Sequence, residues 1–359
     1  MNDIYEEGLA KITHSNAFLN PKAKLLRDVS VGICQVLPIK DAKVLDATAA
    51  TGIRGIRYYL EAKAKNVTFL DISKGAYNDI KSNMKINNVE GKIFNGSFQL
   101  FANSTKEKFD IIDIDPFGSS APYIFDSLKI VHNGSYLFVT STDTAVLCGA
   151  KPKACRRIYD SIPMHNHLCH EAGIRILIGY IARIAAQFNF GITPIYSIVY
   201  DTYMRVFLRV DYGSKEVERT LNNMGFAYYC ENCGFTGLEK TEFPQDKCKI
   251  CGRKLKVSGK MWGGSLYDKN ISSSVARILE NNDKYEFKIV KKIFEELDLP
   301  FYYYLPIITK KLKKSSVKIS ALGEKLNKLG YQFSETHMHR QSIKTNAPVS
   351  VIEDIINQI

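Results

Sequence analysis

Between about Lys22 and Val210, short apolar runs alternate with longer stretches in which apolar residues recur every three or four positions. Short runs of this kind are typical of buried strands, and the longer spacing is typical of helices that cover a sheet. We expect strands at Val44–Asp46, Val67–Ile72, Phe109–Asp113, Tyr136–Thr140, Ile195–Tyr200 and Arg205–Val210. We expect helices at Ile53–Ala62, Lys74–Ile86, Pro122–Val131 and Leu168–Phe188. Strands separated by helices form parallel βαβ units, so the pattern predicts an α/β fold with a doubly wound sheet.

The pattern changes near Gly213, where a segment with paired cysteines begins. A tail with helical periodicity follows, at Val317–Leu329 and Ser350–Ile359. The chain has 359 residues, which is enough for about two domains. We therefore predict one domain at 1–212 and a smaller α+β domain at 213–359, with the cysteine segment at about 226–258. A small helical module and a winged-helix module both remain open for the tail.

The sequence contains no apolar run near the ~18 residues that a membrane span needs. The first residues, Met1–Glu7, are polar and partly acidic. We therefore expect a cytoplasmic protein without a secretory signal and without a membrane partner. We predict no obligate protein partner.

Basic residues outnumber acidic ones, 49 Lys and Arg against 37 Asp and Glu, which gives a formal net charge of +12. This excess favours a polyanionic partner such as RNA, although charge alone fits a role in solubility equally well. The last residues, Phe301–Ile359, hold nine basic and four acidic side chains. We expect a compact basic patch made of Lys310, Lys311, Lys313 and Lys314, with Arg340 and Lys344 as candidate additions to it. Such a patch would contact RNA phosphates, and a solvated helix face is the alternative.

Four of the eight cysteines stand alone in the sequence, as small buried residues often do, at Cys34, Cys148, Cys155 and Cys169. The other four form two Cys-x-x-Cys pairs, each followed by a glycine, at Cys230, Cys233, Cys248 and Cys251. Paired thiolates at this spacing typically hold a tetrahedral, closed, structural Zn²⁺ site. We therefore favour a zinc site, and the alternative is four cysteines that bind no metal. We expect the metal to supply folding energy to a segment too short to form its own core.

Three histidines, His165, His167 and His170, cluster in the sequence near Cys169 and Glu171. Their spacing resembles a metal site only loosely, and most histidines of this kind are loop or cap residues. We assign no metal to them, and their roles stay open.

A turn of Ala, Thr and Gly residues follows the predicted strand Val44–Asp46 and leads into a helix that opens at Ile53. Small residues let the backbone approach a ligand, and a helix N-terminus offers unpaired N–H groups. Asp71 ends the next strand, where a carboxylate accepts hydrogen bonds from ribose hydroxyls in dinucleotide folds. Because the turn lacks G-x-G-x-x-G, we predict a nucleoside site with Asp46, Gly52 and Asp71 instead of an NAD site. An ordinary capped strand-to-helix turn is the alternative.

The residues Asp-Ile-Asp-Pro-Phe-Gly at 113–118 follow the apolar run Phe109–Ile112. They put carboxylates, backbone carbonyls and a flat ring at one point, which suits a planar amine. The lone pair of an exocyclic base nitrogen is delocalised, so Asp115 need only accept an N–H, orient the lone pair and take the proton. Phe117 would stack on the base. The two halves together predict an S-adenosylmethionine enzyme that methylates a base amine, and a helix-capping role for Asp113 or Asp115 is the alternative.

Several motifs together resemble one known family. They are Asn20-Pro21 with Arg27-Asp28, Asp46 to Arg57, Asp71 to Ser73, Asp113 to Ser119, Leu147 to Ala150, Cys169 to Arg175, and Lys344 to Pro348. The chain resembles the tRNA (guanine-N2-)-dimethyltransferases of archaea and eukaryotes, in their archaeal type, which act on the guanine at tRNA position 26. The resemblance implies a Rossmann-like class I methyltransferase fold, S-adenosylmethionine as cofactor and tRNA as partner.

The resemblance also implies roles for single residues. It assigns cofactor contacts to Arg27, Arg54, Asp71, Ser97 and Phe98. The methionine carboxylate is a natural ligand for the two arginines, the ribose for the aspartate, and the adenine for Ser97 or Phe98. It assigns catalysis to Asp115 and the base contact to Phe117.

The implied reaction transfers one or two methyl groups to the exocyclic N2 of guanine 26. Two alternatives stay open. Methylation of adenine N6, or of another guanine N2 in RNA, uses the same acidic-Pro-aromatic sequence. A non-catalytic, zinc-containing RNA-binding protein is the second alternative, which the presence of both Asp71 and Asp115 disfavours.

Overall fold

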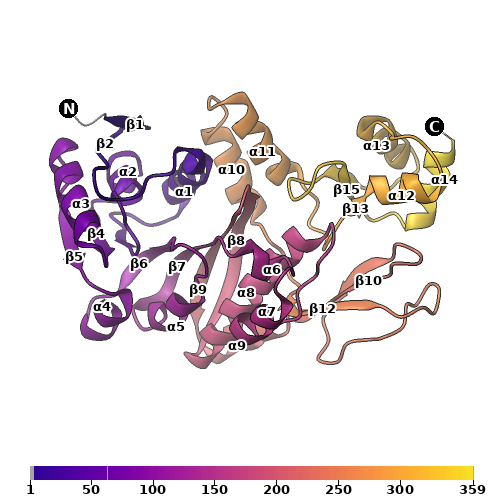
Figure 1. Ribbon diagram of the computed structural model, residues 1–359, viewed down its shortest axis with the longest axis horizontal. Helices are drawn as coiled ribbons and strands as arrows, with labels where there is room; N and C mark the ends of the chain where they lie inside the picture. Colours follow the sequence, from indigo (N-terminus) through magenta and orange to yellow (C-terminus); the bar gives the residue numbers. More distant parts are fainter. Residues whose placement is uncertain (1–3, 63, 359) are drawn as a thin grey trace. The chain divides into compact units, whose positions relative to one another are not determined.

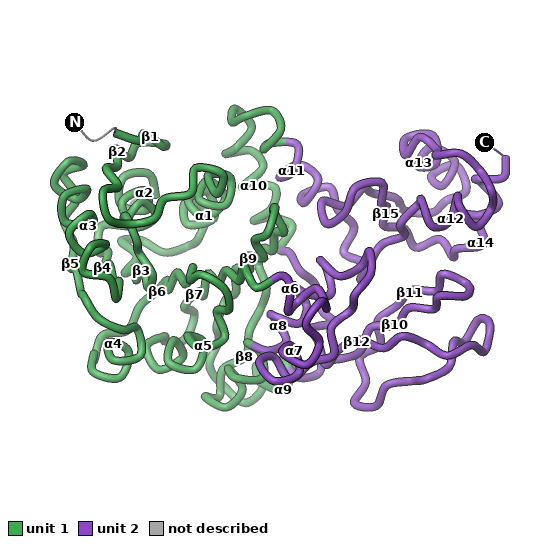
Figure 2. Tube along the Cα trace, in the orientation of Figure 1, with its two compact units in different colours: residues 1–143, 181–220, 268–287 green, residues 144–180, 221–267, 288–359 purple. Residues whose placement is uncertain are grey.

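The computed structural model describes residues 4–62 and 64–358, and its chain divides into two compact units, drawn in Figure 2. Unit 1 comprises residues 1–143, 181–220 and 268–287, and unit 2 comprises 144–180, 221–267 and 288–359. The chain therefore passes through each unit three times. We predicted a methyltransferase domain at 1–212 and a tRNA-binding domain at 213–359. This functional boundary after residue 212 stays a prediction.

Unit 1 contains a seven-stranded sheet with the strand order β5-β4-β3-β6-β7-β9-β8. The strands are β3 (Lys43–Asp46), β4 (Asn66–Asp71), β5 (Gly91–Asn95), β6 (Phe109–Ile114), β7 (Val131–Ser141), β8 (Phe190–Tyr200) and β9 (Tyr203–Tyr212). The six predicted strands are confirmed. β5 was not predicted, because most of its side chains are exposed and it has no apolar run.

The first five strands of this sheet are parallel, but β9 runs antiparallel to both β7 and β8. The sheet is therefore mixed, and the expectation of parallel units throughout is wrong at this edge. Only Asp201 and Thr202 separate β8 from β9, which leaves no room for the crossover helix that parallel neighbours require.

Helices cover both faces of this sheet. They are α1 (Lys24–Val36), α2 (Ile53–Glu61), α3 (Lys74–Ile86), α4 (Phe98–Ser104) and α5 (Ala121–Ser127), with α9 (Ser214–Leu221) and α10 (Lys269–Ile278) later in the chain. Figure 1 shows α1, α2 and α3 on one side and α4 and α5 on the other. The predicted helix Pro122–Val131 is wrong at its end, because Ile130 turns back to pair with Phe109 and Val131 begins β7.

Unit 1 also contains a short N-terminal hairpin, β1 (Tyr5–Glu7) and β2 (Ala10–Ile12), and a 3-10 turn, η1 (Pro21–Ala23). The strand order of the large sheet reverses between β3 and β6, since β4 and β5 follow on one side and β7 on the other. Ligands of such sheets bind beyond the carboxyl ends of the strands at this reversal. The fold thereby brings the ends of β3, β4 and β6 to the place where a nucleoside site is expected.

Unit 2 contains two three-stranded antiparallel sheets, β11-β10-β12 and β13-β15-β14. The strands are β10 (Met224–Tyr229), β11 (Thr236–Glu239), β12 (Lys256–Trp262), β13 (Tyr303–Tyr304), β14 (Phe333–Glu335) and β15 (Ser342–Thr345). Its helices are α6 (Thr144–Leu147), α7 (Pro152–Tyr159), α12 (Leu305–Lys311), α13 (Ile319–Lys328) and α14 (Val349–Asn357). Two longer helices, α8 (Cys169–Gln187) and α11 (Lys284–Glu295), begin or end in unit 1.

The tail is a mixed module and not an all-helical one. β13, β14 and β15 form its sheet, and α12, α13 and α14 pack with it around a core that includes Leu322, Leu326, Ile343 and Ile352. The winged-helix alternative therefore fits better. α14 covers most of the predicted helix Ser350–Ile359, whose last residue lies outside the described residues. Within residues 4–62 and 64–358, every helix is too short or too polar to cross a bilayer.

Candidate functional site

The turn after β3 is shaped by a buried carboxylate and two glycines. Asp46 is 1% exposed, and its side chain accepts a hydrogen bond from the backbone N–H of Gly55 at 3.1 Å. Gly52 has a φ of 78°, in the left-handed region that glycine adopts without strain. A Cβ on Gly55 would lie 2.3 Å from the ring of Phe69 in β4. Burial, and then the charge of Asp113, raise the pKa of Asp46 to about 7, so this carboxyl organises the turn from inside the fold.

Asp71, at the end of β4, faces the same turn. One of its carboxylate oxygens accepts from the N–H of Ala50 at 2.9 Å, and the other accepts from the N–H of Ser73 at 2.8 Å. Each carboxylate oxygen has about two acceptor positions. The orientation of Asp71 is therefore fixed while acceptor capacity remains for ribose hydroxyls.

Ser97 and Phe98 lie at the start of α4. The Ser97 hydroxyl caps the helix by accepting from the N–H of Leu100 at 3.2 Å. Phe98 is 2% exposed and packs on Tyr123, with ring centroids 5.6 Å apart. Burial, and then the charge of Asp71, raise the pKa of Tyr123. The contacts of Ser97 and Phe98 with an adenine stay a prediction.

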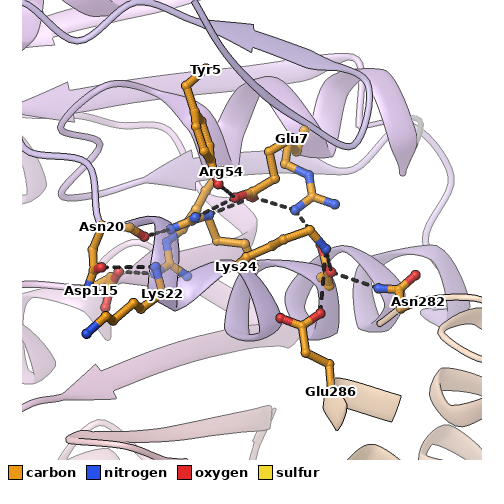
Figure 3. A network of polar contacts seen from close by, with 12 residues as sticks. Tyr5, Glu7, Asn20, Lys22, Lys24, Arg54, Asp115, Asn282 and Glu286 are labelled. Atoms are coloured by element: carbon orange, nitrogen blue, oxygen red, sulfur yellow. Dashed lines mark hydrogen bonds and ion pairs between the residues drawn. The ribbon is translucent and has the colours of Figure 1, made fainter. Parts of the chain in front are cut away.

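Arg54 links the cofactor turn to Asp115. Its Nη2 donates to a carboxylate oxygen of Asp115, as Figure 3 shows. The residue is 7% exposed, and its Nη1 is buried without a hydrogen-bond partner among the described residues. Leaving a buried donor unsatisfied costs about 1–3 kcal/mol, and more when the donor belongs to a charged group. The orphaned Nη1 therefore fits an anionic ligand group, such as a carboxylate.

Asp115 is held in its ionised form. Burial opposes ionisation, but the charges of Arg54 and then Arg205 outweigh it and keep the pKa of Asp115 below its ordinary value of 3.8. Its backbone N–H donates to the hydroxyl of Thr48 at 2.9 Å, and 20% of its side chain remains exposed. A fixed, charged and accessible carboxylate thus stands just beyond the end of β6.

Phe117 is an exposed ring on a fixed loop. It is 80% exposed and meets the ring of Phe18 edge to face, with centroids 5.2 Å apart. The next residue, Gly118, has a φ of 76° and exchanges two hydrogen bonds with Thr142, at 2.8 and 2.9 Å. The loop therefore presents the ring to solvent in one orientation, which suits stacking on a flat base.

Asp113 differs from Asp115 although it stands only two residues before it. It is 1% exposed and accepts two hydrogen bonds from Arg205, at 2.9 and 2.8 Å, and one from the hydroxyl of Tyr58 at 2.5 Å. Arg205 is fully buried in β9 and also donates to the hydroxyl of Ser30 at 3.1 Å. Sequence reasoning missed Arg205, although a lone arginine inside an apolar strand signals a buried carboxylate partner.

Arg27, a predicted cofactor contact, is engaged within the protein. It is 4% exposed, its Nε donates to Glu7 at 2.7 Å, and its Nη1 donates to the carbonyl of Asn20 at 3.1 Å. Figure 3 shows the polar contacts of Glu7 and Asn20 in this network. Burial opposes ionisation of Glu7, but Arg27 and then Arg57 outweigh it and lower its pKa to about 2. The contact of Arg27 with the cofactor stays a prediction.

Unit 2 brings the four paired cysteines together. Their sulfur atoms all lie within 4.8 Å of one another, and the residues are Cys230, Cys233, Cys248 and Cys251. The Sγ atoms of Cys230 and Cys251 are 3.5 Å apart, and those of Cys233 and Cys248 are 3.6 Å apart. Four sulfurs at about 2.3 Å from a tetrahedral Zn²⁺ lie about 3.8 Å from each other. The donor set therefore fits zinc.

The two Cys-x-x-Cys turns have the same backbone geometry. Gly234 and Gly252 have φ values of 74° and 71°. Their N–H groups donate to the carbonyls of Cys230 and Cys248, at 2.9 and 2.8 Å. Glycine after each pair is therefore required by the turn itself.

The basic patch stays a prediction, but the residues proposed for it differ in exposure. Lys310, Lys311, Lys313, Lys314 and Arg340 are exposed. The expectation that Lys344 extends the patch is wrong. Its side chain is 1% exposed, and its ammonium pairs with Glu296 at 2.9 Å and with Glu171 at 3.2 Å, because a buried cation needs carboxylate partners.

The chain has close relatives of known description. Residues 3–357 match the family model described as N2,N2-dimethylguanosine tRNA methyltransferase. The tRNA (guanine(26)-N(2))-dimethyltransferase of Pyrococcus abyssi is 34% identical over 380 residues, covering 98% of this chain and 97% of the relative. The enzyme of the same description from Pyrococcus horikoshii is 35% identical over 382 residues, covering 99% and 98%.

A solved structure agrees with this relationship. The complex of Trm1 from Pyrococcus horikoshii with S-adenosyl-L-methionine superposes with a TM-score of 0.91 at 34% identity, and covers 99% of both chains. The Rossmann-like methyltransferase fold is thereby confirmed, and so is the resemblance drawn from the motifs. The chain belongs to the N2,N2-dimethylguanosine tRNA methyltransferase family.

Proposed function

We propose that this protein transfers one or two methyl groups from S-adenosylmethionine to N2 of the guanine at position 26 of tRNA, in the cytoplasm. Relatives described with this activity align over nearly the whole chain, which favours guanine N2 over adenine N6 and over a non-catalytic RNA-binding role. The observation that carries the proposal is the Arg54–Asp115 pair. It joins the predicted cofactor turn to an ionised carboxylate beside the exposed ring of Phe117.

The cofactor residues fit their predicted ligand group by group. Bound S-adenosylmethionine supplies the methyl group to be transferred. The buried, unpartnered Nη1 of Arg54 would receive its carboxylate, and Asp71 would accept from its ribose hydroxyls. Gly52 gives the turn its left-handed backbone conformation, and Ser97 and Phe98 would border the adenine.

Asp115 acts on the base amine by position and charge. Its carboxylate accepts one N–H of guanine N2 and turns the nitrogen lone pair toward the donor. As positive charge develops on the nitrogen, the carboxylate stabilises it and then takes the proton. Because its pKa lies below the ordinary value, Asp115 remains ionised at every pH above about 5. Protonation of Asp115 should therefore not lower the methylation rate in that pH range. Phe117 stacks on the guanine ring and fixes its plane.

Zinc and tRNA complete the proposal. Zn²⁺ held by the four paired cysteines would stabilise the segment at about 226–258, as a closed structural site. The exposed lysines at the end of α12 would contact tRNA phosphates.

The test is Asp115→Asn, which keeps the shape of the side chain and removes its charge. The assay incubates an unmodified tRNA transcript with labelled S-adenosylmethionine and identifies the methylated nucleoside. We expect a rate at least about 100-fold lower, the scale of general-base contributions. Asp298→Asn, an exposed carboxylate elsewhere, is the matched control. Unchanged turnover of Asp115→Asn, or a product other than N2-methylated guanosine, would contradict the proposal.

A further inference from the structure

Two thiols and an imidazole meet in unit 2, as a group separate from the four paired cysteines. Cys148 directly follows α6, and Cys169 and His170 open α8. One ligand atom from each of these three residues lies within 4.8 Å of the other two. Cys148 is distant in sequence from the histidine cluster, because all of α7 lies between them. We propose that Cys148, Cys169 and His170 form a second zinc site.

The spacing of the three donors suits a tetrahedral zinc ion. Zinc binds thiolate at about 2.3 Å and imidazole at about 2.0–2.1 Å, so its donors lie about 3.5–3.8 Å apart. The donors here have to close by at most about 1.3 Å, which side-chain rotation supplies. All three residues are partly exposed, so an ion reaches them from solvent.

The His170 ring is already held in the form that a metal ligand needs. Its Nδ1 lies 2.9 Å from the carbonyl oxygen of Met338. A carbonyl only accepts, so Nδ1 carries the proton and the lone pair is on Nε2. Histidines that bind metals typically donate their other N–H to a carbonyl or carboxylate in this way. The hydrogen bond thus sets both the tautomer and the direction of the ring.

The next residue anchors the turn that carries two of the donors. Glu171 is fully buried, accepts from Arg175 at 2.9 Å and from the N–H of Phe301 at 2.7 Å, and pairs with Lys344. These contacts fix the first turn of α8. The zinc donors on it are therefore largely preorganised, which lowers the ordering cost of binding.

The proposed site has an open side. Its donors border a depression of about 490 Å³ whose lining also includes Thr144, Ala145 and Asn166. His165 lies on the same rim, and its Nδ1 lies 3.0 Å from the carbonyl of Cys148. With three protein donors, the fourth position is left to water, as in zinc sites that exchange a ligand. This distinguishes the site from the closed one formed by the paired cysteines.

The test counts zinc in the full chain. The protein is purified with a reductant, equilibrated with Zn²⁺, freed of unbound metal, and analysed for zinc per chain. We expect Cys148→Ser/Cys169→Ser to hold one ion fewer per chain than the unchanged protein, and His170→Ala to bind that ion at least about 10-fold more weakly. Cys34→Ser and His14→Ala, which lie outside both metal-donor groups, are the matched controls.

A second measurement uses the unchanged protein, so it does not depend on whether the variants fold. Zn²⁺ should slow alkylation of Cys148 and Cys169 by iodoacetamide at least about 10-fold, as read by peptide mass spectrometry. Equal zinc content in the double variant and the unchanged protein would overturn the proposal. Equal alkylation with and without Zn²⁺, or a Cys148–Cys169 disulfide in the zinc-equilibrated protein, would do so too.

Discussion

At the scale of single residues, Arg54 has two tasks that only a guanidinium combines. One of its nitrogens donates to Asp115, and another is buried without a partner. We predict that Arg54→Lys weakens S-adenosylmethionine binding about 10- to 100-fold, because one ammonium does not replace a planar fork and a charge-assisted hydrogen bond is worth about 1.5–3 kcal/mol. Calorimetry measures the effect, with Arg157→Lys, an exposed arginine, as control. Equal cofactor affinities of Arg54→Lys and the unchanged protein would show that Nη1 of Arg54 does not bind the cofactor.

Phe117 allows a second test at this scale because its ring supports little of the fold. It is 80% exposed, so Phe117→Ala should leave the melting temperature nearly unchanged. Loss of stacking costs about 1–3 kcal/mol per base, so we expect kcat/KM for tRNA to fall about 5- to 150-fold. Phe243→Ala removes a ring with the same 80% exposure and should change neither quantity. Similar kinetics in the two variants would remove Phe117 from the base site.

Asp113 and Asp115 show which features of the site could be predicted from the sequence and which could not. The motif around them indicated a base-amine site, but two acidic residues in one motif look alike in sequence. Their difference comes from Arg205, which stands far along the chain in β9 and neutralises Asp113 inside the core. A lone arginine in an apolar strand signals a buried carboxylate, but it does not say which carboxylate 92 residues away is the partner. The role of Asp115 in catalysis stays a prediction, whereas the pairing of Asp113 with Arg205 becomes visible only in the folded structure.

At the scale of elements, the packing of α2 against β4 depends on one glycine. A Cβ on Gly55 would lie 2.3 Å from a ring atom of Phe69, so the ring or the helix has to move. We predict that Gly55→Ala lowers the free energy of unfolding by about 1–3 kcal/mol, the usual cost of overpacking. It should also weaken cofactor binding, because displacement of the helix would disturb the hydrogen bond from the backbone N–H of residue 55 to Asp46, which organises the turn.

The control for this variant is a glycine with room for a methyl group. A Cβ on Gly32 in α1 meets its neighbours at 3.8 Å, an ordinary contact, and alanine favours a helix by about 1 kcal/mol over glycine. In urea denaturation, the free energy of unfolding should therefore fall in Gly55→Ala and rise in Gly32→Ala. Equal stability of Gly55→Ala and the unchanged protein would mean that this contact relaxes without cost.

Elements with strong local signals were predicted well. The helix Lys74–Ile86 has its predicted bounds, because the Ser73 hydroxyl caps it and its apolar residues keep one period. Elements whose form depends on distant partners were not. The exposed strand Gly91–Asn95 exists because it pairs with β4, and the antiparallel edge of the sheet follows from pairing among β7, β8 and β9.

At the scale of the whole molecule, an excess of positive charge predicts how tRNA binding responds to salt. Four exposed lysines follow one another closely at the end of α12, and one of them, Lys311, is shared with Glu353 at 2.6 Å. We predict that changing Lys310, Lys311, Lys313 and Lys314 to Gln weakens tRNA binding. Each phosphate contact that is lost should also lower the slope of log K against log salt by about 1.

A variant with equal net charge separates a local patch from the general charge of the chain. Lys81, Lys85, Lys106 and Lys215 are exposed and lie in unit 1, and their change to Gln removes the same four charges. Long-range attraction is screened beyond about 8 Å at physiological salt, so at that salt only contacts with phosphate should matter. If filter binding across a salt series gives the two variants the same affinity and slope, tRNA is held by the overall charge and the tail makes no specific contact. A reduced slope in the tail variant alone would assign phosphate contacts to α12.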